Sequence, residues 1–199
     1  MPTASSLYPL SIAALQALDH TAFVARLGGV VEHSQWVVER AWTQAPFACF
    51  DGLYEALARC IHDAARPEQI ALLRVHPELA GREAVAGTMT PDSSAEQARL
   101  GLMALSAQAM ARMRALNRAY QARFDFPFIV ALRLHDSLES VLLTGEARLR
   151  HELDFEFPIA LGQVCEVMRG RLACAVRDTP NTTHSSPPSP VSTVPRNLP

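Results

Sequence analysis

The sequence lacks the motifs by which many cofactor-dependent enzymes are recognised. Its seven histidines form no HExxH and no H-x3-5-H pair, so the common kinds of zinc site have no support. It has no Walker loop, no GxGxxG and no GxSxG elbow, so nucleotide binding, dinucleotide binding and serine hydrolysis lack support as well. These absences narrow the candidate chemistry to acid and base catalysis by side chains alone.

Cysteine is scarce and the apolar runs are short. The four cysteines, at positions 49, 60, 165 and 174, form no CxxC pair and are too few for a disulfide scaffold, which favours a reducing compartment. Residues 1–10 lack a basic start followed by a long apolar run, and no segment approaches the ~20 apolar residues of a membrane span. The last three residues do not match the Ser-Lys-Leu peroxisomal address. We therefore expect a soluble, cytoplasmic protein.

Charge of one sign does not dominate the chain either. The 199 residues have a formal net charge of −2 and a pI near 6.4, with both signs scattered along the sequence. Such a chain has no basic face for nucleic acid or an anionic membrane, so neither is an expected partner. The apolar fraction is 49%, which is ample for one core in a domain of this size.

Helical periodicity is what the sequence does have. Ser11 and Asp19 are residue types that cap helices, with Thr21 as another possible start for the second helix and Gly28-Gly29 as its end. The longest predicted helix runs from Ser93 to Arg123, with one buried stripe. The stripe contains Leu102, Leu105, Ala109, Met113, Leu116 and Tyr120; a similar stripe contains Val164, Val167, Met168 and Leu172; the other predicted helices span residues 11–18, 19–28, 32–43, 50–65 and 67–74.

The pattern predicts an all-α fold, a single compact multi-helix domain over residues 1–177. Within it, Phe126 to Leu134 is short, apolar and interrupted by Pro127, which is compatible with an extended segment or with a buried helical start. From Asp178 onward the chain is rich in Pro, Ser and Thr, with almost no apolar side chains. Such a segment cannot offset its ordering entropy, so we predict a disordered tail over residues 178–199. The same composition would suit a linker.

His76 is the leading candidate for chemistry, in the stretch His76-Pro77-Glu78-Leu79-Ala80-Gly81. Pro77 disfavours the α region at the preceding residue, so His76 should leave the end of the helix before it. A helix C-terminus carries partial negative charge that raises the pKa of an imidazole, which suits a general acid near neutral pH. The same position also suits a histidine that only caps the last helix carbonyls.

A polar cluster follows at Ser93, Glu96 and Gln97. The spacing of Ser93 and Glu96 is that of a capping box at a helix start. If the helix has already begun by Ser93, the three side chains instead share one face and offer hydroxyl, carboxylate and amide groups to a polar ligand. The spacing does not choose between these roles.

Arg133 ends the apolar run that begins at Phe126. A guanidinium there can hold a carboxylate with two parallel hydrogen bonds. The alternative is an internal salt bridge, for which Glu96 is a candidate partner.

Five motifs occur in an order that resembles one family. Each is weak alone, but the ordered set, spread over residues 10–177, is specific, and it resembles the 2-oxo-4-hydroxy-4-carboxy-5-ureidoimidazoline (OHCU) decarboxylase family of urate breakdown. The motifs are Glu32-His33-Ser34-Gln35-Trp36, the His76–Gly81 stretch, Ser93-x-x-Glu96-Gln97, Leu116-Asn117-x-x-Tyr120 and Phe126-Pro127-Phe128-Ile129.

The resemblance implies an all-helical fold, usually dimeric, that uses no metal or organic cofactor. It implies decarboxylation of OHCU to (S)-allantoin, the last step from urate. His76 matches the family's catalytic histidine, and Glu96 belongs to its substrate-binding cluster. As a hypothesis of mechanism, Glu96 is a second catalytic residue, which either orients His76 or binds the ureido N–H groups of the substrate. The implied substrate-binding residues are Pro77, Ser93, Gln97, Ile129, Val130, Ala131, Leu132 and Arg133.

Three positions depart from the family pattern. Glu78 stands where Asp is usual, and Gln35 where Pro is usual. Glu78 keeps its charge. Asp125 stands where Gly is usual, and a glycine position suggests a positive φ that aspartate tolerates only moderately.

Two other functions are compatible with the same residues. The chain would suit the decarboxylase half of a bifunctional ureide-pathway protein, with the Pro/Ser-rich segment as its linker. It would also suit a non-catalytic helical interaction module, in which the His76 and Ser93 segments only begin and end helices.

Overall fold

The computed structural model describes residues 9–178, which form the all-α fold that the sequence predicts. The predicted tail lies outside the described residues except for Asp178, whose carboxylate accepts a hydrogen bond from the Phe50 amide at 2.6 Å. The helices are α1 (Ile12–Gln16), α2 (His20–Leu27), α3 (Trp36–Trp42), α4 (Phe50–His62), α5 (Arg66–Arg74), α6 (Arg82–Ala86), α7 (Pro91–Arg99), α8 (Ala107–Phe124), α9 (Leu138–Arg148), α10 (Leu153–Ala175) and the 3-10 turns η1 (Leu102–Ala104) and η2 (Leu132–Leu134).

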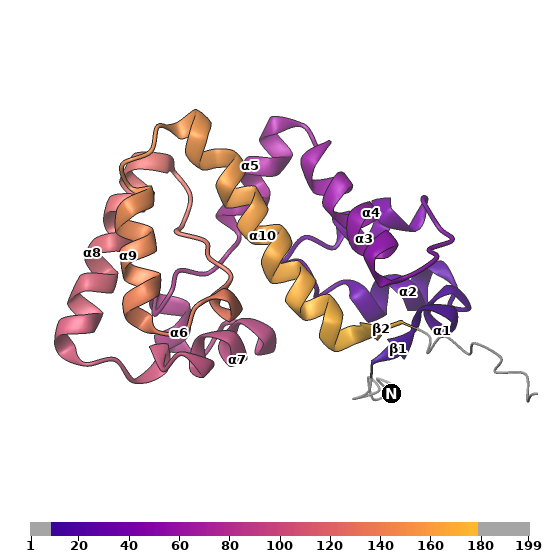
Figure 1. Cartoon of the computed structure of the whole chain (residues 1–199), viewed down its shortest axis with the longest axis horizontal. Coiled ribbons are helices and arrows are strands. Elements are labelled where there is room, and N and C mark those ends of the chain that lie inside the picture. Colours follow the sequence, from indigo (N-terminus) through magenta and orange to yellow (C-terminus); the bar gives the residue numbers. More distant parts are fainter. Residues whose placement is uncertain (1–8, 179–199) are drawn as a thin grey trace, which may run out of the picture.

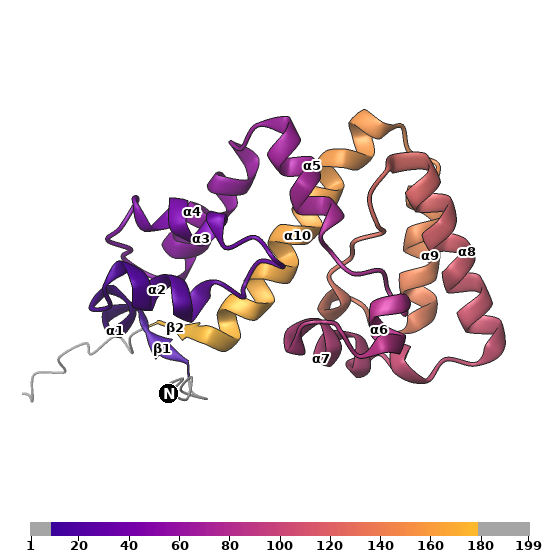
Figure 2. The same cartoon turned by 180° about the vertical axis from the view of Figure 1, so that it is seen from behind.

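Helix α10 is the central element. It has 23 residues and runs between two groups of helices, α1–α5 on one side and α6–α9 on the other (Figures 1 and 2). A feature that the periodicity did not predict joins its C-terminal end to the start of the fold: β1 (Leu10–Ser11) pairs in parallel with β2 (Val176–Arg177). Side chains on both flanks of α10, such as Leu57 and Tyr120, are fully buried in one core.

Two predicted helix starts are confirmed by their caps. The Ser11 hydroxyl accepts a hydrogen bond from the Ala14 amide at 3.1 Å, and the Asp19 carboxylate accepts one from the Ala22 amide at 2.8 Å. Each satisfies a backbone donor that the first helical turn leaves free. Gly28 follows the last residue of α2, as its position in the sequence predicts.

The prediction of one helix from Ser93 to Arg123 is wrong, because the helix is interrupted between α7 and α8. Gly101 adopts a left-handed conformation with φ of 70°, which ends the helix. Ser106 then caps α8, accepting a hydrogen bond from the Ala109 amide at 3.2 Å. The apolar stripe is nevertheless largely buried, because Leu102 in η1 and Met113, Leu116 and Tyr120 in α8 all lie in the core.

The helix predicted over residues 32–43 begins only at Trp36, because His33 has φ of 44°, in the left-handed region. The Phe126 to Leu134 segment runs without helix until η2, so the extended alternative is correct for most of it. Asp125 has the positive φ expected at a glycine position, 62°, and serves as the C-cap of α8. Its carboxylate pairs with Arg74.

Within residues 9–178 no helix is both long and apolar enough to cross a membrane. No three His, Cys, Asp or Glu side chains in that range gather in a group able to hold a metal ion.

Candidate active site

A small cavity brings together segments that are far apart in the sequence. It has a volume of about 40 Å³, which admits little more than one water-sized group. Its walls are the loop after α5, one face of α7, the extended segment that leads into η2, and the C-terminal half of α10. The lining residues are His76, Pro77, Leu79, Ser93, Glu96, Gln97, Phe128, Ile129, Val130, Leu132, Val167 and Arg171.

His76 is buried in this wall with one ring nitrogen anchored. Its Nδ1 lies 2.8 Å from the carbonyl oxygen of Leu72, in the last turn of α5. Because a carbonyl oxygen can only accept, Nδ1 carries the proton of the neutral ring and Nε2 is left as an acceptor. Nε2 makes no hydrogen bond to any residue in the described part of the chain. Thus His76 caps a helix carbonyl and still has one nitrogen available for chemistry.

The pKa of His76 is lowered, contrary to the prediction from its place at a helix end. Burial lowers it from 6.5 to about 4, and the hydrogen bond to Leu72 and the nearby Glu32 carboxylate only partly oppose that effect. The cost of desolvating an imidazolium therefore exceeds the attraction of the helix C-terminus. At neutral pH the ring is neutral, and its free nitrogen is a base.

A buried ion cluster stands beside His76. The Arg171 guanidinium donates through Nε and Nη2 to the two carboxylate oxygens of Glu96, both at 2.9 Å. Its Nη1 donates to Glu32 at 2.7 Å, and its Nη2 also reaches the Ser93 hydroxyl at 3.0 Å. Ser93 in turn donates to Glu32 at 2.8 Å. One guanidinium thus fixes two carboxylates and a hydroxyl in defined positions.

The charges of this cluster stabilise one another. Burial raises the pKa of Glu32, but hydrogen bonds from Arg171, Ser93 and Thr90 and the charge of Arg171 outweigh it and hold that pKa below its usual value. Burial likewise lowers the pKa of Arg171, while its bonds to Glu96 and Glu32 raise it further than burial lowers it. Glu32 and Arg171 therefore stay ionised at neutral pH although both are largely removed from water.

A larger cleft adjoins the cavity. The two share Glu96, Leu132, Val167 and Arg171, and the cleft has a volume of about 360 Å³. Sites for small molecules usually measure about 300–1,000 Å³. Three arginines line the cleft, Arg99, Arg133 and Arg171, together with the carboxylates of Asp92 and Glu96. The lining therefore has a formal excess of one positive charge, which favours an anion. A small anionic ligand can therefore occupy the cleft and insert one end into the cavity beside His76.

A sequence model described as OHCU decarboxylase matches residues 16–173, which cover most of the chain and every residue of the cavity. The chain belongs to the OHCU decarboxylase family.

Relatives and solved structures agree with this membership. Proteins named OHCU decarboxylase from Haloferax volcanii and Mus musculus are 36% and 34% identical, over 84% and 79% of this chain and 96% and 88% of theirs. The fold resembles the crystal structure of an (S)-allantoin synthase, with a TM-score of 0.68, 24% identity and coverage of 84% of this chain and 54% of that one. It also resembles an OHCU decarboxylase crystallised in the presence of (S)-allantoin, with a TM-score of 0.58, 16% identity and coverage of 78% and 96%.

In this OHCU decarboxylase family member the predicted polar cluster is part of the cavity, but not as a capping box. Helix α7 begins at Pro91, and Thr90 caps it by accepting a hydrogen bond from the Ser93 amide at 3.3 Å. Ser93 and Gln97 consequently point into the structure from one helical face, as the second interpretation requires. The Gln97 amide oxygen accepts from the Ala80 amide at 2.8 Å, so Gln97 also holds the loop that carries His76.

The predicted segment from Ile129 to Arg133 contributes unequally. Ile129, Val130 and Leu132 line the cavity, whereas Ala131 and Arg133 line only the outer cleft. Arg133 forms an ion pair, but with Glu166 on α10 rather than with Glu96. Pro77 lines the cavity next to His76.

Sequence reasoning missed Arg171, which is the partner of Glu96. A signal was present: Arg171 follows Met168 by three residues and Val167 by four, so it interrupts the apolar stripe of α10. A charged residue on a buried stripe needs a buried partner of opposite charge. Glu32 lies in the first of the five motifs, and it is the buried carboxylate that the stripe position of Arg171 requires.

A second buried ion pair supports the cavity from behind. Arg148 on α9 donates to the carbonyl of Ile129 at 2.8 Å and, through Nε, to Glu156 at 3.0 Å. Glu156 is completely buried and also accepts from the Tyr120 hydroxyl. Arg148 therefore links the backbone of the cavity wall at Ile129 to the buried carboxylate of Glu156.

We expect Arg148→Met to destabilise the fold by about 3–5 kcal/mol, because it leaves the buried Glu156 carboxylate with only the Tyr120 hydroxyl and the His151 ring as partners. Urea unfolding followed by circular dichroism measures the change. Arg150→Met is the matched control, since Arg150 is exposed and lies two residues after Arg148. This substitution should change the free energy of unfolding by less than about 0.5 kcal/mol. Similar losses in the two variants would contradict the role given to the buried pair.

Proposed function

We propose that this protein decarboxylates OHCU to (S)-allantoin, the last step of urate degradation, with His76 as its catalytic residue and without a metal or organic cofactor. The observation that carries the proposal is the state of His76. Its imidazole is neutral and buried, with Nδ1 anchored on Leu72 and Nε2 left unbonded at a cavity that adjoins a ligand-sized cleft. Family membership supplies the substrate.

The shape of the site suggests how the substrate lies. The ring and ureido group occupy the cleft, because the inner cavity is too small for them. Glu96 is partly exposed there and accepts hydrogen bonds from the ureido N–H groups, while Arg171 sets its orientation. The reacting carbon then faces His76 at the inner end, against the apolar side chains of Ile129 and Val130.

The reaction needs a base and then an acid. Departure of CO2 breaks the bond between the ring carbon and the carboxylate carbon and leaves its electron pair in the conjugated ring, as an enolate after loss of the hydroxyl proton. His76 Nε2 takes that proton, and the imidazolium gives it to the carbon that bears the ureido group. Because the pKa of His76 is about 4, the imidazolium is an effective acid. One further proton from solvent balances the charge left by the departing CO2.

Two features of the cavity assist these steps. The Arg171 guanidinium provides positive charge beside the developing oxyanion, in a site from which water is largely removed. The walls at Leu132 and Val167 are apolar and favour the neutral CO2 over the carboxylate. Since His76 approaches from one side only, the proton reaches one face of the carbon, which accounts for a single enantiomer.

The proposal is tested by generating OHCU from urate in situ and following the circular dichroism of the allantoin that forms. The protein should give optically active (S)-allantoin faster than OHCU decays in buffer. Racemic product at the spontaneous rate would reject the enzyme and favour a helical interaction module. A homodimer and a cytoplasmic location are further parts of the proposal, and light scattering at several protein concentrations tests the first.

We expect His76 to make the fold less stable in mild acid. The ring titrates near 6.5 when unfolded and near 4 when folded, so between these pH values the unfolded state binds more protons. The stability is fully present above pH 6.5 and falls as pH approaches 4, by about 3 kcal/mol in total. Urea unfolding of the native protein and His76→Asn at both ends of this range isolates the effect. A stability difference between the two proteins that does not change with pH would contradict it.

A further inference from the structure

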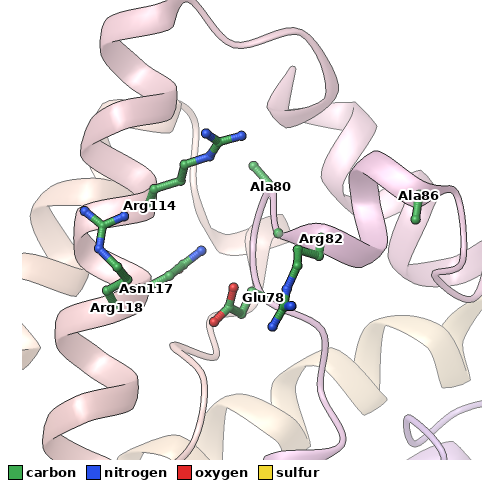
Figure 3. Close-up of a pocket in the computed structure, with 8 residues that line it drawn as sticks. Glu78, Ala80, Arg82, Ala86, Arg114, Asn117 and Arg118 are labelled. Carbon is green, nitrogen blue, oxygen red and sulfur yellow. The ribbon is translucent and has the colours of Figure 1, made fainter.

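A second cavity lies on the other side of the loop that carries His76. It has a volume of about 490 Å³ and shares no lining residue with the candidate active site. Along the loop, His76, Pro77 and Leu79 face the active-site cavity, whereas Glu78, Ala80 and Gly81 face the second one. Figure 3 shows its walls: α6 on one side, α8 on the other, and the loop between them.

Three arginines surround this cavity, Arg82 from α6 and Arg114 and Arg118 from α8 (Figure 3). None of them forms an ion pair or a side-chain hydrogen bond with another described residue, whereas Arg112 on the same helix pairs with two glutamates. Glu78 is the one acidic side chain among the residues that line the cavity. The lining therefore carries a formal excess of two positive charges at a concave surface, which is an arrangement that attracts an anion.

An unsatisfied acceptor lies between the arginines. Asn117 is 3% exposed, and its side chain extends from α8 toward the loop (Figure 3). Its Nδ2 donates to the Leu79 carbonyl at 2.9 Å, but its buried Oδ1 has no hydrogen-bond partner among the described residues. A buried acceptor without a partner is unfavourable, because it has lost its hydrogen bonds to water without a replacement. A ligand that brings an N–H group would provide that replacement.

The charges and acceptors together select a class of ligand. We propose that this cavity binds a small carboxylate whose nitrogen is an uncharged ureido or amide N–H, such as an N-carbamoyl amino acid. The guanidinium groups suit carboxylates, because they offer paired donors. Asn117 Oδ1 and the Glu78 carboxylate accept from the N–H groups. A free amino acid fits less well, since its ammonium group cancels the negative charge that the arginines require.

A single peptide bond, between Leu79 and Ala80, connects the second cavity to the candidate active site. The Leu79 carbonyl accepts from Asn117, which lines the second cavity, while the next amide, at Ala80, donates to Gln97, which lines the first. Ala80 is held there with φ of 48°, in the left-handed region. A ligand on Asn117 would therefore act on the same peptide that Gln97 holds. The proposed binding does not depend on which reaction the candidate active site catalyses.

The test is isothermal titration calorimetry with N-carbamoylaspartate as the probe. It should bind saturably and about tenfold more tightly than succinate, which lacks the N–H groups, or aspartate, which carries an ammonium group. Arg114→Gln and Arg118→Gln should each weaken binding about five- to tenfold. Arg150→Gln removes the same charge from an exposed position outside the cavity and should leave the affinity within about twofold.

Several results would overturn the proposal. Absence of saturable binding would reject the site, and equal affinity for succinate would reject the N–H requirement. Equal weakening by Arg150→Gln would mean general attraction of anions to a basic surface. The probe should bind His76→Asn with unchanged affinity, because His76 lines the other cavity. Loss of binding in that variant would instead place the probe in the active site, whatever the outcome for decarboxylation.

Discussion

His76→Asn should fold and yet lose essentially all acceleration of OHCU decarboxylation. Asparagine can still donate from its amide nitrogen to the Leu72 carbonyl, so the hydrogen bond that fixes residue 76 has a replacement. It has no group that can take a proton from the substrate and return it to carbon. Positioned acid and base groups usually contribute about 10²–10⁴-fold, and we expect a loss of this size in kcat/KM.

The measurement is the rate of (S)-allantoin formation by circular dichroism, with OHCU generated in situ. His20→Asn is the matched control, because His20 is exposed on α2 and lies outside the cavity and the cleft. It should keep the native rate. Turnover in His76→Asn within about twofold of native would remove His76 from the reaction and leave only its helix-capping role.

The pH dependence of the same rate shows whether His76 rests as a base or as a general acid. With a pKa of about 4, neutral His76 is the resting form throughout the physiological range, so activity should not fall as pH rises through 6.5. A general acid with the raised pKa predicted from the helix end would lose activity there. The direction of the pH profile thus decides between the role expected from position alone and the role expected from burial.

The comparison of His76 with Arg171 shows how far the sequence can predict this site. Pro77 correctly placed His76 at a helix end, since that effect depends only on the neighbouring residue. The sign of its pKa shift depends on burial by α7 and α10, which no local pattern contains. Arg171 pairs with residues 75 and 139 positions away, so its role as partner of Glu96 and Glu32 appears only once the chain is folded.

The helices likewise have features that depend on neighbouring residues and features that local patterns do not predict. Ser11 and Asp19 were predicted as caps because a cap is made within one helical turn. Periodicity does not predict the break between α7 and α8, because the apolar stripe continues through η1 with nearly helical spacing. Gly101 and Ser106 are residue types that end and begin helices, but the apolar spacing runs on past both of them.

Arg171→Met should be the most destabilising single change at the site. Its removal leaves Glu32, whose side chain is 1% exposed, with two hydroxyl donors and the exposed His33 ring at 3.7 Å, and it leaves Glu96 without a cation. Breaking one partner of such a buried pair usually costs about 3–5 kcal/mol. Arg133→Met provides the control, because Arg133 pairs with Glu166 at a more exposed position on α10 and should cost about 1 kcal/mol or less.

A double variant separates the structural contribution of Arg171 from its contribution to catalysis. Adding Glu32→Gln to Arg171→Met removes the uncompensated carboxylate while retaining the hydrogen bonds to Ser93 and Thr90. Urea unfolding should therefore show recovery of at least about 1 kcal/mol, since the two residues share one network. The double variant should still fail to make (S)-allantoin at the native rate, because no cation faces the developing oxyanion. If it recovers activity together with stability, Arg171 is only a structural support, and the electrostatic part of the mechanism is wrong.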